Sequence, residues 1–90
     1  MPILKVSALM KYYTDNQTEV PVQGATVIDA LNNAVQKHPA LKAQIFDSNG
    51  KLRRHINIFV NDETIRDLNG LETKLKEEDR VTLLASISGG

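Results

Sequence analysis

The sequence of 90 residues contains no cysteine. This absence excludes a disulfide scaffold, a thiolate metal site, an iron–sulfur cluster held by the chain's own thiolates, and a cysteine nucleophile. Neither sign of charge dominates, because 11 lysine and arginine residues balance 11 aspartate and glutamate residues. No overall field therefore draws the protein towards nucleic acid or an anionic membrane, and we expect neither as a partner.

Long apolar runs are also missing. None approaches the about 18 residues of a membrane span, and residues 1–10 do not have the layout of a signal peptide, so we expect a cytoplasmic protein. Hydrophobic residues make up 41% of the chain and charged residues 24%, a balance typical of a sequence that folds. The length leaves room for one core, which predicts a single domain over residues 1–85 and a C-terminal tail over residues 86–90.

The spacing of the apolar residues predicts strands and one main helix. Leu4, Val6 and Ala8 alternate with polar residues, and a similar period of two recurs further along the chain. Thr26 is a candidate helix N-cap, with Asp29 three residues later in a capping-box-like spacing. The expected strands cover residues 3–10, 18–22, 54–60, 64–66 and 80–85. The main helix follows the Thr26 cap and runs to about residue 37, and a further helical turn covers 41–46.

This order of elements predicts a two-layer α+β domain in which the helix covers one face of a sheet. We interpret it as a β-grasp, ubiquitin-like fold with a mixed sheet of four to five strands and a flexible C-terminal glycine tail. The first and last strands should lie side by side at the centre of the sheet. Asn61-Asp62 suits a tight hairpin turn, because asparagine and aspartate tolerate positive φ angles.

The sequence ends in Gly89-Gly90, shortly after the last expected strand. A C-terminal carboxylate becomes an acyl donor only when it is activated, for example as an acyl-adenylate inside another protein. Two glycines leave no side chain to block a narrow channel, and they permit backbone angles that other residues avoid. Residues 86–90 can extend at most about 16–18 Å. The pair therefore indicates either such a tail or an ordinary frayed terminus.

Several segments, spread over nearly the whole chain, resemble the prokaryotic ubiquitin-like sulfur carriers. That family includes the small subunit of molybdopterin synthase, the thiamine-pathway carrier and the carrier for cysteine biosynthesis. The resemblance is carried by 25–31 (ATVIDAL), 38–42 (HPALK), 46–47 (FD), 50–54 (GKLRR), 56–63 (INIFVNDE), 68–73 (LNGLET), 79–84 (DRVTLL) and the glycine pair. Residues 50–63 and the tail are most similar to the cysteine-biosynthesis type. Residues 85–88 depart from the family, since they lack the proline that often follows the last strand.

The resemblance implies a protein co-substrate and not an enzyme. An adenylating enzyme of the ubiquitin-activating type would use ATP and magnesium to adenylate the Gly90 carboxylate. A sulfur source would then replace AMP and leave a thiocarboxylate, from which a biosynthetic enzyme (cysteine, molybdopterin or thiamine type) takes the sulfur. The chain itself is expected to bind no cofactor and no metal. Gly89, Ser88 and Ile87 are expected to thread into the partner, with Ile87 as the apolar anchor.

Phe59, Leu84 and His55 are candidates for partner docking. If Ile56 and Ile58 face the helix, the side chain of Phe59 lies on the opposite face of the sheet with that of His55, and Leu84 of the last strand joins them. An apolar patch beside the tail suits a docking surface, whereas single exposed apolar residues are common and need no function.

Two other functions stay open at this point. The first alternative to a sulfur carrier is a non-catalytic ubiquitin-like interaction module with an incidental glycine tail. The second is a modifier that is conjugated to proteins through its C-terminus. A modifier would share the activation step and would leave isopeptide-linked adducts. An independent enzyme is the least supported, because His38, Ser86 and Ser88 stand in no recognisable catalytic or metal-binding spacing.

Overall fold

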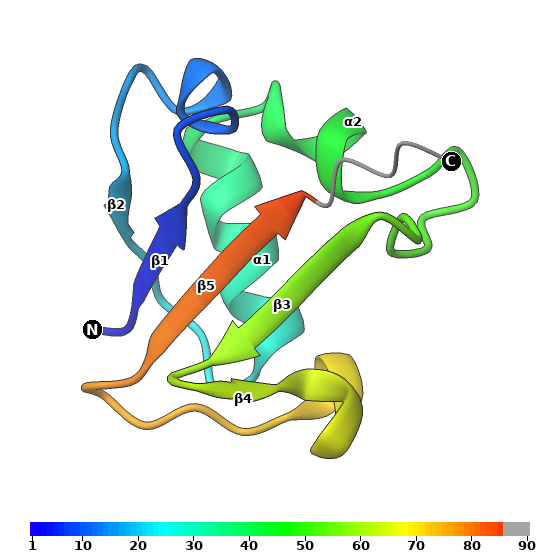
Figure 1. Cartoon of the computed structure of the whole chain (residues 1–90). Coiled ribbons are helices and arrows are strands. Elements are labelled where there is room, and N and C mark those ends of the chain that lie inside the picture. The colour runs from blue at the N-terminus through cyan, green and yellow to red at the C-terminus, as the bar shows by residue number, and fades with distance from the viewer. Residues whose placement is uncertain (86–90) are drawn as a thin grey trace.

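A computed structural model, which describes residues 1–85, has one five-stranded sheet with its helices packed on one face (Figure 1). The strands lie in the order β2-β1-β5-β3-β4, in which β1 and β5 are parallel and the other neighbours antiparallel. The strands are β1 (Ile3–Val6), β2 (Glu19–Pro21), β3 (Ile56–Val60), β4 (Glu63–Thr64) and β5 (Arg80–Ala85). The helices are α1 (Val27–Lys37) and α2 (Leu41–Ile45), with 3₁₀ turns at Lys11–Tyr13, Ile65–Asp67 and Gly70–Glu72.

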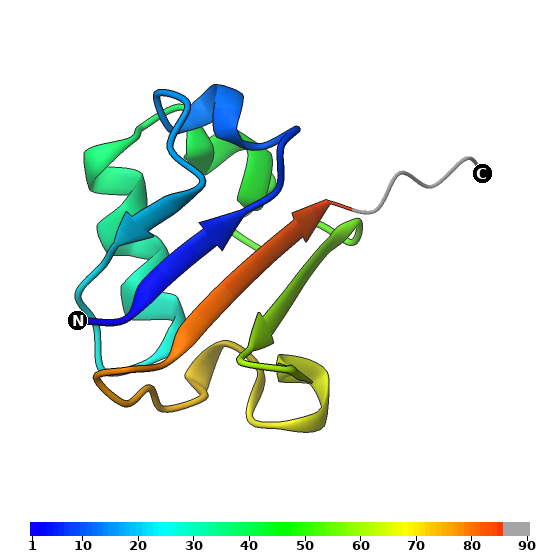
Figure 2. The same ribbon diagram turned by 60° about the vertical axis from the view of Figure 1, so that its left-hand side comes forward.

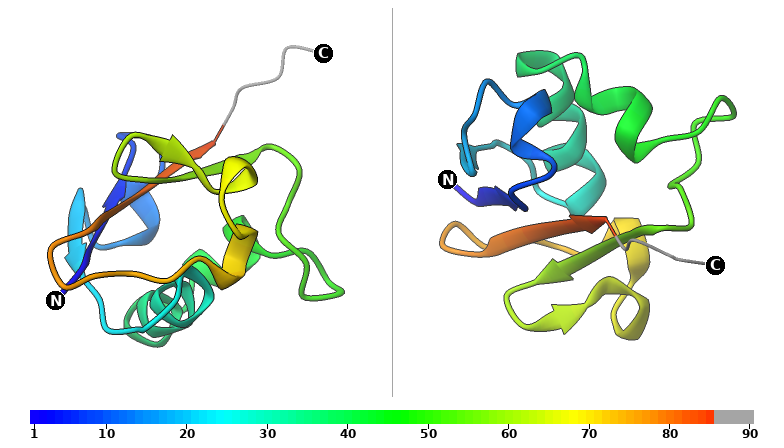
Figure 3. Two further views of the ribbon diagram at one scale, coloured as in Figure 1. Left: turned by 90° about the horizontal axis from the view of Figure 1, so that it is seen from below. Right: turned by 45° about the horizontal axis from the view of Figure 1, so that its top comes forward.

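This arrangement confirms the predicted β-grasp architecture. The first and last strands are neighbours at the centre of a mixed sheet, although nearly the whole chain separates them in sequence. The helix α1 lies across one face, so the described chain forms two layers, as Figure 3 shows from two directions. Within residues 1–85, no helix covers the other face of the sheet, which we call the open face (Figure 2).

The sequence pattern of α1 explains both its start and its buried face. The Thr26 hydroxyl oxygen accepts a hydrogen bond from the Asp29 N–H (3.3 Å), which satisfies one of the first free amides of the helix. The helix ends at Lys37, where the His38 N–H donates to the Ala34 carbonyl (2.8 Å) and Pro39 follows. Its buried residues form one helical stripe, at i, i+3, i+4 and i+7, that faces the sheet: Val27, Ala30, Leu31 and Ala34.

A single apolar core lies between the two layers. Alternate residues of β3 are buried, as are alternate residues of β5, which is the pattern of strands with one covered face. The second helix, α2, closes one end of this core with Leu41 and Ile45. The core consists of Leu4, Val6, Met10, Val20, Val22, Val27, Ala30, Leu31, Ala34, Leu41, Ile45, Phe46, Ile56, Ile58, Val60, Ile65, Val81 and Leu83.

The first strand is shorter than the sequence pattern predicts. It ends at Val6 instead of Met10, because the Ser7 carbonyl accepts the N–H groups of both Met10 and Lys11 (3.0 Å each) and turns the chain. This turn leads into the Lys11–Tyr13 3₁₀ turn and places the Met10 side chain in the core. Burial of the Met10 side chain in the core therefore outweighs the strand-like alternation of residues 3–10 and ends the strand early.

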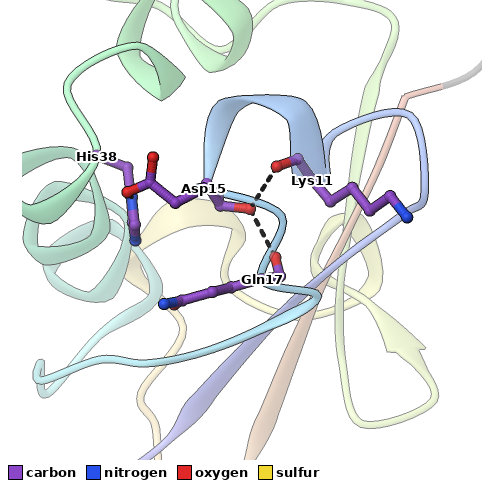
Figure 4. Close-up of polar contacts among 5 residues, drawn as sticks. Lys11, Asp15, Gln17 and His38 are labelled. Atoms are coloured by element: carbon purple, nitrogen blue, oxygen red, sulfur yellow. Dashed lines mark hydrogen bonds and ion pairs between the residues drawn. The ribbon is translucent and has the colours of Figure 1, made fainter.

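The connection between β1 and β2 is held by a buried threonine that the sequence analysis did not single out. The Thr14 side chain is fully buried, and its hydroxyl lies 3.1 Å from the Lys11 carbonyl oxygen and 2.6 Å from that of Gln17 (Figure 4). Beside it, His38 Nδ1 lies 3.5 Å from Asp15 Oδ2. These contacts fix the connection against the end of α1.

The hairpin turn after β3 forms where it is predicted. Asn61 has a φ of +56°, and its side-chain oxygen accepts the Arg80 N–H (3.1 Å) while its amide nitrogen donates to Asp79 (3.1 Å). The strand that follows is Glu63–Thr64 and not 64–66, because Ile65 starts a 3₁₀ turn capped by the Thr64 hydroxyl. The asparagine thus joins this turn to the start of β5.

Candidate functional site

The strand β5 gives the molecule two distinct ends. We name them the Ala85 end, where β5 stops and the chain continues into residues 86–90, and the Arg80 end, where β5 starts (Figure 1). At the Ala85 end, β3 begins opposite Ala85 and β1 ends beside Leu83. The predicted tail residues Ile87, Ser88, Gly89 and Gly90 lie outside the described residues, so their roles stay predictions.

The open face of the sheet carries the residues predicted for docking. Phe59 lies opposite Thr82 and Asn57 lies opposite Leu84, so Phe59 and Leu84 are diagonal neighbours on one face. Such neighbours are about 7–8 Å apart, within reach of an aromatic side chain. Leu84 is 39% exposed, and Phe59 is half-buried. His55 is exposed directly before β3. The structure brings Phe59 and Leu84 together and places His55 at the start of the same strand, and the docking role of the three stays a prediction.

Two exposed apolar side chains at the Ala85 end are missed by the sequence analysis. Leu9 (62% exposed) and Tyr12 (83% exposed) lie in the connection that follows β1. Because β1 runs parallel to β5, this connection emerges at the same end as the tail. The five large apolar residues exposed within residues 1–85 are Met1, Leu9, Tyr12, Leu68 and Leu84, and three of them gather at this end. These side chains are additional candidates for contact with a partner protein.

A hollow of about 510 Å³ lies between α2 and the segment that leads to β3. Two cationic side chains, Lys42 and Arg53, take part in its lining, and the Arg53 Nε–H donates to the Ala43 carbonyl (2.8 Å). This bond holds the guanidinium against α2. The hollow is lined by Pro39, Lys42, Ala43, Phe46, Asp47, Ser48 and Arg53.

Asp47 organises the turn that borders this hollow. Its Oδ1 accepts the backbone N–H groups of Lys51 and Asn49, each at 2.9 Å. The Lys51 hydrogen bond is the largest cause of a pKa below the ordinary value for this carboxyl group, and the Asn49 bond and the positive charges of Arg53 and Lys51 act in the same direction. The carboxylate is therefore the stable form at neutral pH, and it keeps the turn closed.

Acid is expected to open the turn over residues 47–51 only below pH 3.8, the ordinary pKa of aspartate. Because the pKa in the folded protein is lowered, the carboxylate contributes stability above that value, and the contribution is lost as pH falls through the lower pKa. The measurement is the amide NMR shift of Lys51 during an acid titration, with a midpoint expected below 3.8. The Asp47→Asn variant should lack this transition. A midpoint at or above 3.8 contradicts the assignment.

Other kinds of site find little support in the described part of the chain. Within residues 1–85, no three histidine, aspartate or glutamate side chains come together as possible metal ligands. Nor does this part contain a helix long and apolar enough to cross a membrane. The features that stand out are therefore the surface at the Ala85 end and the position from which the tail begins.

Comparison with known proteins decides the family. The model described as the ThiS family matches residues 4–90. This chain belongs to the ThiS family. The match covers all of the described strands except the first residue of β1, and it includes the glycine pair at 89–90. The resemblance drawn from the sequence is thereby confirmed at the level of the family.

Curated proteins similar in sequence to this ThiS-family chain include sulfur carriers and small modifiers. The sulfur carrier protein CysO of Mycobacterium tuberculosis is 30% identical over 89 residues, which cover 97% of this chain and 96% of the relative. Small archaeal modifier protein 1 of Haloferax volcanii is 39% identical over 72 residues, which cover 79% of this chain and 78% of the relative. The chain is thus a member of a group of sulfur carriers and ubiquitin-like modifiers, near the CysO type.

Solved structures support the same grouping. A chain of the BexX/CysO complex of Amycolatopsis orientalis superposes with a TM-score of 0.90 at 31% identity, with 100% of both chains covered. Small archaeal modifier protein 1 of Methanosarcina acetivorans superposes with a TM-score of 0.87 at 38% identity, covering 99% of this chain and 95% of the other. The ThiS-family chain therefore has the β-grasp, ubiquitin-like fold. Its relatives are named as carriers and modifiers, which agrees with the expectation that it is not an enzyme.

Proposed function

We propose that this chain is a sulfur carrier that uses the carboxylate of Gly90. A Gly90 oxygen attacks the α-phosphorus of ATP in a partner adenylating enzyme, which displaces pyrophosphate and forms an acyl-adenylate. A sulfide donor then attacks the acyl carbon and displaces AMP, leaving a thiocarboxylate that a biosynthetic enzyme consumes. The observation that carries this proposal is the ThiS-family match through residue 90, together with the similarity to CysO.

The fold supports this role through the position of β5. The strand lies at the centre of the sheet, with β1 on one side and β3 on the other. Its inward residues Val81 and Leu83 are fully buried in the core. The base of the proposed tail is therefore anchored in the core up to Ala85. Because residues 50–63 and the glycine pair resemble the cysteine-biosynthesis type of carrier, we assign the sulfur to that type of pathway.

Conjugation to other proteins is a second candidate function. Its support is the identity of 39% to small archaeal modifier protein 1 of Haloferax volcanii and of 38% to its Methanosarcina acetivorans counterpart. A modifier would form the same acyl-adenylate, but the acyl group would pass to a lysine amine and not to a sulfide donor. Mass spectrometry of cell extracts would then find Gly90 joined to lysine side chains of other proteins.

Adenylation itself is tested by ATP–pyrophosphate exchange. The chain, ending at Gly90, is incubated with ATP, magnesium, labelled pyrophosphate and the adenylating enzyme of the source organism. The enzyme preparation is first shown to be active on another carrier protein. We expect exchange that depends on the chain and disappears when Gly89 and Gly90 are deleted. An interaction module without acyl chemistry would give no exchange and would bind its partner equally well after the deletion.

Removal of the Leu84 side chain is expected to weaken docking without affecting the chemical step. The Leu84→Ala variant should raise the KM for the chain in the exchange assay by about tenfold, the effect of an apolar interface residue worth about 1.4 kcal/mol, with kcat unchanged. Leu68→Ala is the matched control, because Leu68 is 36% exposed, close to the 39% of Leu84, but lies away from the Ala85 end. Equal KM values for the two variants contradict the docking role.

A further inference from the structure

The balanced charge of the chain hides a separation of charge along the sequence. Residues 38–60 contain four basic residues and one acidic residue, a net charge of +3. Residues 61–85 contain four basic and seven acidic residues, a net charge of −3, and residues 1–37 contain three of each. The full chain is neutral only because these two segments cancel.

The fold places the two charged segments at opposite ends of the sheet. The positive segment runs through α2 into the start of β3, and Ile56 there lies opposite Ala85. The negative segment begins where β3 has ended, and the Asn61 N–H donates to the Arg80 carbonyl (2.7 Å). In Figures 1 and 2 the green α2–β3 connection lies at the Ala85 end, and the yellow and orange turns lie at the Arg80 end. The Ala85 end is therefore positive and the Arg80 end negative.

The cations at the Ala85 end are displayed to solvent. Lys42, Lys51 and Arg54 are exposed, and Arg53 is half-buried against α2 through its bond to Ala43. The one acidic residue of this segment, Asp47, accepts two backbone N–H groups of its own turn. The cations therefore outnumber the carboxylates on this surface, and two of them line the 510 Å³ hollow.

We propose that the cations at the Ala85 end dock onto an acidic surface of the protein that activates Gly90. The inference rests on the proposed function and adds the charge of the partner's surface. Aspartate and glutamate side chains around the partner's entrance for the tail would attract the Ala85 end and repel the Arg80 end. Most encounters would then orient the Ala85 end, and with it the start of the tail, towards the partner. Complementary charge of this kind raises association rates by about 10–10³ and selects orientation.

The structure favours a protein surface over nucleic acid as the occupant. Exposed apolar side chains, Leu84, Leu9 and Tyr12, lie at the same end as the cations, and aromatic and arginine side chains are enriched at protein interfaces. A polyanion would be attracted by the Ala85 end but repelled by the negative Arg80 end. An acidic protein patch of limited size meets only the positive end.

The test compares two double variants that change the net charge equally. Lys42→Glu with Arg54→Glu reverses two exposed cations at the Ala85 end, whereas Lys74→Glu with Lys76→Glu reverses two exposed cations in the other segment. In the ATP–pyrophosphate exchange assay, the first variant should raise the KM for the chain by about tenfold or more at low salt, with kcat unchanged. The second should match the unchanged chain, and melting temperatures check that both variants fold.

Salt dependence provides a second readout. Raising the ionic strength from about 0.01 M to about 0.15 M shortens the screening length from about 30 Å to about 8 Å, so the KM of the unchanged chain should rise. The KM of the Lys42→Glu/Arg54→Glu variant should change little or fall over the same range of ionic strength.

Three outcomes overturn the inference. If the unchanged chain is active and both double variants have the same KM, the acidic partner surface is wrong and the proposed function stands. Absence of exchange with the unchanged chain contradicts the proposed function, and the inference falls with it. Tight binding of a fluorescent single-stranded oligonucleotide that is lost in the Lys42→Glu/Arg54→Glu variant would assign the surface to nucleic acid instead.

Discussion

Alanine in place of Gly90 is expected to abolish activation of the chain while leaving its fold intact. The added methyl group would stand next to the reacting carboxylate, inside a channel that the glycine pair is proposed to enter. Misplacement of a reacting group by about 1 Å can cost about a hundredfold in rate, so ATP–pyrophosphate exchange should fall by about a hundredfold or more. The melting temperature should stay that of the unchanged chain, since the core lies within residues 4–83.

Gly70→Ala is the control for this experiment. It adds the same methyl group at a turn glycine that has a φ of +59° and no neighbouring atom within 4 Å. Gly70 precedes β5 by ten positions and takes no part in the proposed docking surface. The control should therefore retain exchange. Normal thiocarboxylation of the Gly90→Ala variant would contradict the assignment of Gly90 as the acyl site.

The largest effect on stability is expected from alanine in place of Gly24. A Cβ atom at this position would lie 2.5 Å from the Ala30 amide nitrogen and 2.8 Å from the Asp29 carbonyl carbon. Both are backbone atoms in the first turn of α1, where the Ala30 N–H donates to the Thr26 carbonyl (3.0 Å). Relief of the overlap requires movement of the helix start, and overpacking of this kind costs about 3 kcal/mol. For a domain of this size, the melting temperature should fall by roughly 12–24 °C.

Gly50→Ala separates this close approach from the general cost of replacing a glycine. Gly50 has a φ of +78°, and a Cβ there would have no atom within 4 Å. The strain of a left-handed alanine alone is about 1 kcal/mol, so its melting temperature should fall by roughly 4–8 °C. Equal losses for the two variants would show that the contact between Gly24 and α1 is not the cause.

The fold was predictable because the strand, helix and turn signals agree with one another. The alternation in 56–60 and 80–85, the Thr26 cap and the positive φ at Asn61 all appear in the structure where the sequence places them. The family could also be assigned from short segments spread along the chain, and the ThiS-family match confirms it. These are local features, and each depends on only a few neighbouring residues.

The features that the sequence analysis missed exist only when the elements of the fold are packed together. The requirement for glycine at position 24 has no signal in the sequence, because its contact with Ala30 exists only once the helix is in place. Strand β1 ends early because Met10 turns into a core completed by other elements. The charge separation is hidden in the total charge, because the +3 of residues 38–60 and the −3 of residues 61–85 cancel.

The predicted docking surface could likewise be only partly predicted from the sequence. Period-two alternation places Phe59 and Leu84 on the open face, and the register of β3 against β5 agrees with it. Leu9 and Tyr12 lie at the same end as Leu84 only because β1 runs parallel to β5 and its following connection emerges there. Parallel pairing of the first and last strands is a property of the fold, so single segments do not reveal it.

The central claim is that Gly90 acquires a thiocarboxylate, and the most direct measurement is the intact mass of the chain after thiol-specific alkylation. The native-ended chain is incubated with ATP and host-cell extract, alkylated, repurified and weighed. Since the sequence contains no cysteine, the unreacted chain should take up no label, whereas sulfur exchange alone could be mistaken for oxidation of Met1 or Met10. We expect one ATP-dependent label that fragment masses locate at Gly90. No label, in an extract that activates a known carrier, would contradict the sulfur-carrier function.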